Sequence, residues 1–163
     1  MMIRFEDGDN LFNYRVAGMA IHNQSVLLHQ AVGDGFWTCP GGRAELGETA
    51  EQTLIREMRE ELGIEIEIVR LLWFVENFFT YADKRCHEIS LYFLMRLPAV
   101  SKYIIEPGPY SCLEENSKLI FQWFPLRQEV LSAAQLLPAF LQTALLELPQ
   151  TAQHVVQIDE SAY

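Results

Sequence analysis

The sequence has few cysteines and no paired cysteine motif. Cys39, Cys86 and Cys112 are widely spaced among 163 residues, and no CxxC pair occurs. An odd, scattered set of cysteines predicts neither a disulfide framework nor a zinc site. We therefore expect three reduced thiols.

Long apolar runs and basic residues are also scarce. No apolar run reaches the roughly 18 to 20 residues that a membrane span requires, and acids stand where a signal peptide would be apolar. The 12 Lys and Arg face 22 Asp and Glu, and the net charge of −10 argues against binding a nucleic acid polymer. We expect a soluble, cytoplasmic protein without membrane or nucleic acid partners. A small phosphorylated ligand is compatible with this charge if a metal ion supplies positive charge.

Length and composition are typical of one globular domain. Hydrophobic residues make up 50% and aromatic residues 12% of the chain, which argues against disorder. A chain of 163 residues is about the length of a single domain. We therefore predict one domain over residues 1–163.

The sequence reads as alternating strands and helices. The polar pair Asn23-Gln24 predicts a hairpin turn between two strands, and the polar segment 81–85 predicts a second, longer hairpin. Residues 98–117 contain three prolines and predict an irregular loop. The expected strands are 14–22, 25–29, 64–79, 88–97, 119–124 and an edge strand at 154–156, with a final helix after Pro138.

The strongest local prediction is a helix that begins after Thr49. Thr49 and Gln52 fit a capping box, and Leu54, Met58 and Leu62 recur at four-residue spacing. Gly63 then stands where a left-handed cap ends a helix.

Three acids share one face of this helix. Glu57, Glu60 and Glu61 project together because residues three and four apart lie on the same side. Like charges at this spacing repel unless a cation lies among them, and Mg²⁺ prefers such oxygen ligands. From the helix alone, the alternative to a metal site is an acidic face that is simply solvated. A calcium-binding EF-hand is not indicated, because the spaced acids of its loop are absent.

The segment around these acids resembles the signature of the Nudix hydrolase family. That signature consists of Gly, five residues, Glu, seven residues, Arg-Glu, an aliphatic residue, any residue, Glu-Glu, any residue, Gly and an aliphatic residue. The matching positions are Gly42, Glu48, Arg56, Glu57, Met58, Glu60, Glu61, Gly63 and Ile64, of which Met58 is slightly unusual. The resemblance implies a Nudix fold, an α/β fold in which an α/β/α sandwich surrounds a mixed β-sheet.

The resemblance also implies an activity. Nudix enzymes use Mg²⁺ or Mn²⁺ to hydrolyse the pyrophosphate bond of a nucleoside diphosphate linked to another group. By similarity Glu57, Glu60 and Glu61 are the metal ligands, together with a backbone carbonyl of Gly41 or Gly42. Glu57 is also implied to orient or deprotonate water, and Arg56 to hold Glu57 in place. Glu48 corresponds to the family's carboxylate at the start of the helix.

The family's general base often lies outside this signature. Glu114 and Glu115, in the loop before the 119–124 strand, are placed for that role by analogy, and we select Glu115 as the catalytic candidate. A solvated loop acid is the alternative.

The second hairpin contributes candidate substrate-binding residues. Folding it about Ala82 sets Glu76 and Glu88 opposite each other, which suggests that they face a cation or ligand, but a slip of one residue would separate them. Phe79 is the candidate for stacking on a base, in a cluster with Asn77, Phe78, Tyr81 and His87, although strand aromatics are more often core. With Glu48, these residues form our predicted substrate site. His22, His29 and His154 show no ligand spacing and are expected to be ordinary.

The resemblance leaves two functions to distinguish. The chain is either a metal-dependent pyrophosphohydrolase or a silent Nudix-fold module that binds a nucleotide without cleaving it. The complete carboxylate set favours the enzyme. The resemblance does not determine the nucleotide substrate, because ADP-ribose-like and nucleoside triphosphate substrates both fit, nor whether the chain forms a homodimer.

Overall fold

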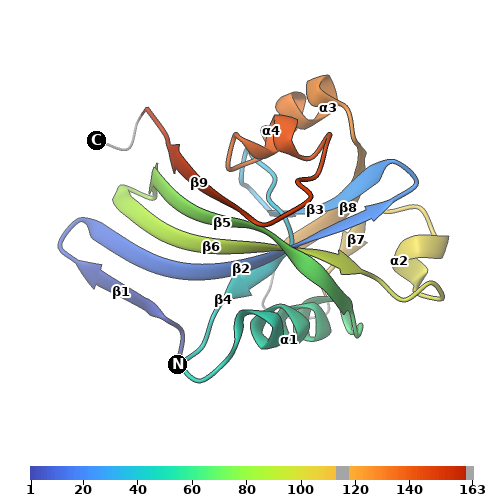
Figure 1. Ribbon diagram of the computed structural model, residues 1–163, viewed down its shortest axis with the longest axis horizontal. Coiled ribbons are helices and arrows are strands. Elements are labelled where there is room, and N and C mark those ends of the chain that lie inside the picture. The colour runs from blue at the N-terminus through green and yellow to red at the C-terminus, as the bar shows by residue number, and fades with distance from the viewer. Residues whose placement is uncertain (113–117, 161–163) are drawn as a thin grey trace.

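A computed structural model describes residues 1–112 and 118–160. A mixed β-sheet forms the centre of the molecule, with α1 on one side and α3 and α4 on the other (Figure 1). Within the described residues the strand order is β7-β8-β3-β2-β6-β5-β9, and β1 and β4 also pair with β2. Most pairs are antiparallel, but β2 with β6 and β5 with β9 are parallel. The prediction of an α/β fold with a mixed sheet is confirmed.

The bounds of the strands differ from the predictions mainly at their ends. The second strand begins four residues earlier than expected, and the long strand predicted from Ile64 begins at Glu67. The strands are β1 (Arg4–Asp7), β2 (Asn10–His22), β3 (Ser25–Ala31), β4 (Gly41–Arg43), β5 (Glu67–Tyr81), β6 (Lys84–Arg96), β7 (Tyr110–Ser111), β8 (Leu119–Pro125) and β9 (Gln153–Ile158). The edge strand near the C-terminus is confirmed, whereas β1, β4 and β7 were not predicted.

Helix α1 (Ala50–Leu62) forms as its sequence predicts. Thr49 and Gln52 make both hydrogen bonds of the capping box, and Gly63 closes the helix with a φ of 67°. Leu54 and Met58 are fully buried and pack against β2 and β6. The burial of this apolar face leaves the acids of α1 on the sides that border the sheet and the solvent.

The other face of the sheet is covered by shorter helices. Leu131 of α3 (Gln128–Ala133) and Leu141 of α4 (Leu141–Ala144) are fully buried against Leu28 and Trp73. The final helix predicted after Pro138 is therefore α4, and it is only one turn long. A further short helix, α2 (Lys102–Ile105), lies in the segment that we expected to be irregular.

The β5–β6 hairpin has a register that corrects one prediction. Its turn consists of two residues, Ala82 and Asp83, with φ values of 48° and 62°. Because the hairpin is centred between these residues rather than on Ala82, Asn77 pairs with Glu88, and Glu76 pairs with Ile89. The predicted Glu76–Glu88 pair was therefore wrong by one residue, and a shift of one places the two side chains on opposite faces of the sheet.

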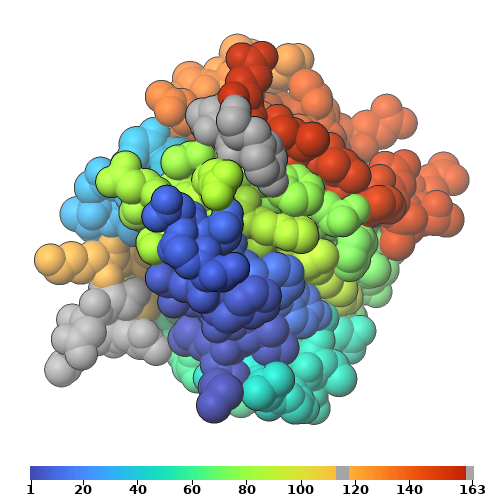
Figure 2. Space-filling model, turned by 90° about the vertical axis from the view of Figure 1, so that its left-hand side faces the viewer, coloured from blue at the N-terminus to red at the C-terminus, as the bar shows by residue number. Residues whose placement is uncertain are grey.

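One end of the sheet gathers strands from the whole chain. Figure 2 shows the N-terminal strands, the β5–β6 hairpin and the C-terminal β9 side by side at this end. Over the described residues, no helix has the length and apolar character needed to cross a membrane. The three cysteines are unpaired, as predicted.

Candidate active site

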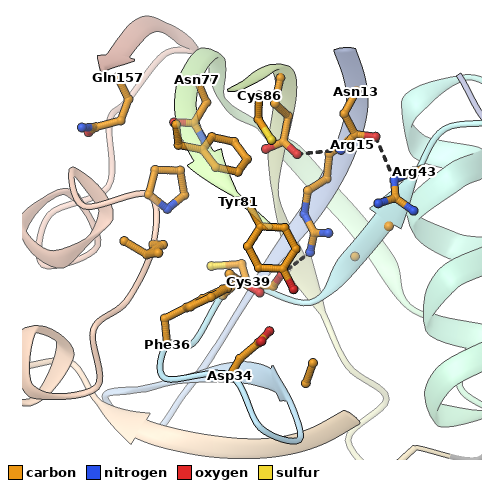
Figure 3. Close-up of a pocket in the computed structure, with 18 of the residues that line it drawn as sticks. Asn13, Arg15, Asp34, Phe36, Cys39, Arg43, Asn77, Tyr81, Cys86 and Gln157 are labelled. Carbon is orange, nitrogen blue, oxygen red and sulfur yellow. Dashed lines mark hydrogen bonds between the residues drawn. The ribbon is translucent and has the colours of Figure 1, made fainter. Parts of the chain in front are cut away.

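A cavity of about 860 Å³ lies on the face of the sheet opposite to the one that packs against Leu54 and Met58 of α1. It extends to Glu57 and Glu61 of the same helix. Figure 3 shows its lining, with Arg15 and Arg43 toward α1 and with Asn77 and Gln157 farther along the sheet. The carboxylate end of the cavity is formed by Gly41, Gly42, Arg43, Glu57 and Glu61. Its hairpin end is formed by Asn77, Phe79, Tyr81, Glu88 and Gln157.

The carboxylate end is organised by Arg56. Its Nη1 donates to Glu57 Oε1 at 2.8 Å and to Glu60 Oε2 at 3.1 Å, and its Nε donates to Glu48 Oε1 at 2.7 Å. Glu57 and Glu61 are 9% and 7% exposed and line the cavity, whereas the side chain of Glu60 is 44% exposed and lies outside the lining. The structure thus brings two of the three predicted ligand carboxylates to the cavity. The contact expected between Arg56 and Glu57 is present.

The charges in this network shift the proton affinities of its members. The hydrogen bond from Arg56 lowers the pKa of Glu48 to about 2, and the bond from the Thr53 hydroxyl acts in the same direction. Burial raises the pKa of Glu57, although Arg56 opposes the shift. Hydrogen bonding to Glu48 raises the pKa of Arg56, so the guanidinium stays charged. Glu48 is therefore the permanent counter-ion of Arg56, and Glu57 is the more basic carboxylate.

The geometry at Gly42 tests whether this end suits a divalent ion. A Cβ atom on Gly42 would overlap the carboxyl group of Glu57, so the absence of a side chain lets the carboxylate lie against the β4 backbone. Among residues 1–112 and 118–160, no three His, Cys, Asp or Glu side chains form a complete metal cluster. Mg²⁺ commonly uses only one or two carboxylates, with waters and substrate phosphates as its other ligands. Glu57, Glu61 and a nearby backbone carbonyl fit that donor set.

Two arginines line the cavity beside these carboxylates. Arg15 Nη2 donates to the carbonyl of Cys39 at 3.1 Å and lies 3.3 Å from His29 Nε2. Arg43 Nε donates to Asn13 Oδ1 at 2.9 Å. Burial lowers the pKa of Arg43, and the positive charges of Arg4 and Arg15 add to this effect. These two guanidinium groups place positive charge in the cavity beside the carboxylates of Glu57 and Glu61.

A buried hydrogen-bond chain connects the two ends of the cavity. Asn13 receives the bond from Arg43 and donates through Nδ2 to Glu88 Oε2 at 2.7 Å. The Ser90 hydroxyl donates to Glu88 Oε1 at 2.8 Å. Glu88 is 7% exposed and lines the cavity, so its carboxylate is held in a fixed orientation at the hairpin end.

The hairpin end combines aromatic and amide side chains. Phe36 and Tyr81 meet edge to face, with ring centroids 6.1 Å apart, at the side where Figure 3 shows both rings. Asn77 is 7% exposed and directly opposite Glu88 in the sheet, and Gln157 reaches this end from β9. Amides and a carboxylate next to aromatic rings can both hydrogen-bond the edge of a base and stack on its face.

Several predicted residues lie elsewhere. Glu48 is in the Arg56 network and does not line the cavity, and Glu76 faces outward and lies 2.8 Å from His154 Nε2. Glu88 and Phe79 do line it. Glu114 and Glu115 lie outside the described residues, so the general base stays a prediction.

Sequence reasoning missed two arginines and two amides of the lining. Asn13, Arg15, Arg43 and Gln157 reach the cavity from three different strands. The spacing of Asn13 and Arg15 along β2 was the available signal, because residues two apart in a strand share a face.

Comparison with known proteins agrees with the fold. Residues 13–143 match the NUDIX domain family, which is most of the chain. The chain therefore belongs to the Nudix hydrolase family, and its architecture is the Nudix fold.

Individual relatives support this assignment. The RNA pyrophosphohydrolase of Tolumonas auensis is 31% identical over 138 residues, which cover 76% of this chain and 78% of that protein. The putative mutator protein MutT4 of Mycobacterium tuberculosis is 43% identical over 61 residues, which cover 37% of this chain but only 25% of that protein. A solved NUDIX hydrolase structure from Nitrosomonas europaea superposes with a TM-score of 0.60 at 19% identity, covering 82% of this chain and 85% of that one, and shows a shared fold.

Proposed function

We propose that this chain is a metal-dependent pyrophosphohydrolase that cleaves a pyrophosphate bond in a small nucleotide derivative. The observation that carries the proposal is one continuous cavity with two chemically different ends. Glu57 and Glu61 line one end, and Asn77, Phe79 and Glu88 line the other. A nucleotide has the same division, with a polyphosphate at one end and a base at the other.

The carboxylate end provides for the phosphates. Mg²⁺ or Mn²⁺ bound at Glu57, Glu61 and the Gly41–Gly42 backbone would neutralise phosphoryl oxygens and lower the pKa of a bound water. Arg56 holds one oxygen of Glu57 and leaves the other available to the cavity. The raised pKa of Glu57 makes this carboxylate a better proton acceptor than an ordinary one. Arg15 and Arg43 line the same cavity beside these carboxylates and can bind phosphate oxygens there.

The hairpin end favours a single nucleoside over a polymer. Its aromatic rings and fixed polar groups line a cavity of about 860 Å³, a volume of the order of a small-molecule site. The net charge of −10 opposes the long phosphate chain of an RNA, even though the Tolumonas auensis relative is called an RNA pyrophosphohydrolase. The substrate classes to compare are therefore nucleoside triphosphates and ADP-ribose-type dinucleotides.

The test is a product-release screen on the purified protein. Nucleoside triphosphates, ADP-ribose, NAD-type dinucleotides, diadenosine polyphosphates and a 5′-triphosphorylated RNA are each incubated with and without Mg²⁺ or Mn²⁺. Glu61→Gln is the site variant. Glu51→Gln is the matched control, because Glu51 lies in the exposed first turn of the same helix.

The expected result is metal-dependent turnover of one small-nucleotide class that Glu61→Gln abolishes and Glu51→Gln retains. If a nucleotide binds but every substrate stays intact, the chain is a binding module and the proposal is wrong. Preference for the triphosphorylated RNA would retain the reaction and overturn the choice of a small substrate.

A further inference from the structure

His29 is a buried ring next to the carboxylate end of the cavity, and it lies outside the 42–64 signature. Its backbone N–H and C=O are both paired with Thr38 at 2.9 Å. The ring packs against Phe121 of β8, with centroids 5.3 Å apart, and the residue is 5% exposed. These contacts fix the orientation of the imidazole, so the direction of its two nitrogen atoms is defined.

Arg15 determines which of these nitrogens carries the proton. Its Nη2 lies 3.3 Å from His29 Nε2, and a guanidinium can only donate. His29 Nε2 therefore accepts, and in the neutral ring the proton is on Nδ1. Arg15 is itself anchored by the Cys39 carbonyl at 3.1 Å. The tautomer is thus set at Nε2, whereas Nδ1 is the nitrogen that lies near Glu61.

An acceptor of suitable chemistry, the Glu61 carboxylate, lies near the Nδ1–H group. In the described part of the chain, Nδ1 is buried and has no hydrogen-bond partner. Glu61 Oε2 lies 3.9 Å from it. Leaving a buried N–H without an acceptor is unfavourable, and a small rotation of the Glu61 side chain would close this gap. The Nδ1–H of His29 is therefore a buried donor close to the Glu61 carboxylate.

We propose that His29 is a positioning residue that donates from Nδ1 to the Glu61 carboxylate and orients it for metal binding. This inference rests on the proposed function, because Glu61 needs such positioning only if it binds a metal. Carboxylates that bind metals are generally held by a hydrogen bond from the surrounding protein, and loss of that bond weakens metal affinity. Arg15 contributes indirectly by fixing the His29 tautomer.

Two substitutions separate this role from simple packing. In His29→Asn the side-chain amide lies near the position of Nδ1 and can still donate to Glu61. In His29→Gln the amide lies near Nε2, so it can bind Arg15 but leaves Glu61 without the donor. Mn²⁺ affinity is measured by electron paramagnetic resonance of free Mn²⁺, without substrate, and folding by circular dichroism and thermal unfolding.

We expect His29→Gln to weaken Mn²⁺ binding about tenfold or more, and His29→Asn to stay within about threefold of wild type. In the Glu61→Gln background, His29→Gln should cause no further loss. Equal affinities of all His29 variants, or losses that add to that of Glu61→Gln, would overturn the positioning role. If Glu61→Gln itself binds Mn²⁺ normally, the metal assignment in the proposed function fails instead.

A measurement on the unaltered protein keeps the inference testable if a variant does not fold. Nitrogen-15 NMR of the His29 ring reports the tautomer directly. We expect a protonated Nδ1 whose signal shifts when Mg²⁺ is added. A ring protonated on Nε2, or an Nδ1 signal that Mg²⁺ leaves unchanged, contradicts the proposal.

Discussion

The two ends of the cavity are built in different ways. The carboxylate end comes from residues 41–63, where Gly42, Arg56, Glu57 and Glu61 lie on one strand and the helix that follows it. The hairpin end pairs Asn77 with Glu88 across the β5–β6 hairpin and adds Gln157 from β9, and Glu88 is held by Asn13 of β2, 75 residues away. The difference suggests that the bond-breaking machinery is a local unit, whereas recognition of the substrate depends on how distant strands pair.

The largest expected effect is at Glu57. Replacing Glu57 with Gln should lower kcat by about 10²-fold or more, since it removes a charge that the proposed metal and water require. The fold should persist because burial already raises the pKa of this carboxyl, and a neutral side chain avoids that penalty. Steady-state kinetics and thermal unfolding measure both quantities, with Glu51→Gln as the control. A large loss of thermal stability would identify Glu57 as structural.

Neighbouring glycines sharpen the distinction between chemistry and fold. Gly42→Ala should lower kcat about 10- to 100-fold with the fold intact, because the new Cβ displaces only the movable end of Glu57. Gly41→Ala should instead destabilise the protein, since its φ is 147° and its Cβ would overlap the backbone of Val16. The kcat and the thermal unfolding temperature are measured for both variants. If both lose stability, or both lose only kcat, the two glycines do not have separate roles in the site and in the fold.

Adjacent residues on β5 test the hairpin end. Asn77→Ala should lower kcat/KM about tenfold, mainly through KM, because it removes roughly one hydrogen bond to the substrate. Glu76→Ala should change kcat/KM less than about twofold, since Glu76 faces away from the cavity and contacts His154. Substrate titrations on both variants provide the comparison. A larger effect at Glu76 would mean that the outward face takes part in binding.

At Glu48 the prediction concerns the stability of the fold. Glu48→Gln should cost about 2 kcal/mol at pH 7, because Arg56 loses a charged hydrogen-bond partner. The pKa of Glu48 is lowered to about 2, so its stabilisation is present above its ordinary value near 4.5 and disappears as the pH falls toward 2.

Urea unfolding at pH 7 and pH 3 gives the free energy of unfolding of wild type and of Glu48→Gln, and the difference between the two is compared at the two pH values. The exposed Glu65→Gln is the control, since its ion pair with Arg59 lies in solvent and contributes little. If the stability difference between wild type and Glu48→Gln is as large at pH 3 as at pH 7, the Glu48 charge does not stabilise the fold.

The sequence predicted the fold better than the site. Helix α1, its caps and the β5–β6 hairpin could be predicted because capping and periodicity are local properties. The Glu76–Glu88 pair was wrong because the hairpin turns on two residues with positive φ, Ala82 and Asp83, and nothing in the polar segment 81–85 specified that centre. A register error of one residue exchanges the two faces of the sheet.

The sequence by itself determined the carboxylate end, since Glu57 and Glu61 share a face through helix geometry and Arg56 is their neighbour in the chain. Only the tertiary structure decided that Glu60 turns to solvent, that Asn77 rather than Glu76 faces Glu88, and that the ring of His29 lies 3.9 Å from Glu61. Helical spacing acts over a few residues. The parallel pairing of β2 with β6, which joins residues about 75 apart such as Asn13 and Glu88, depends on the packing of the whole core.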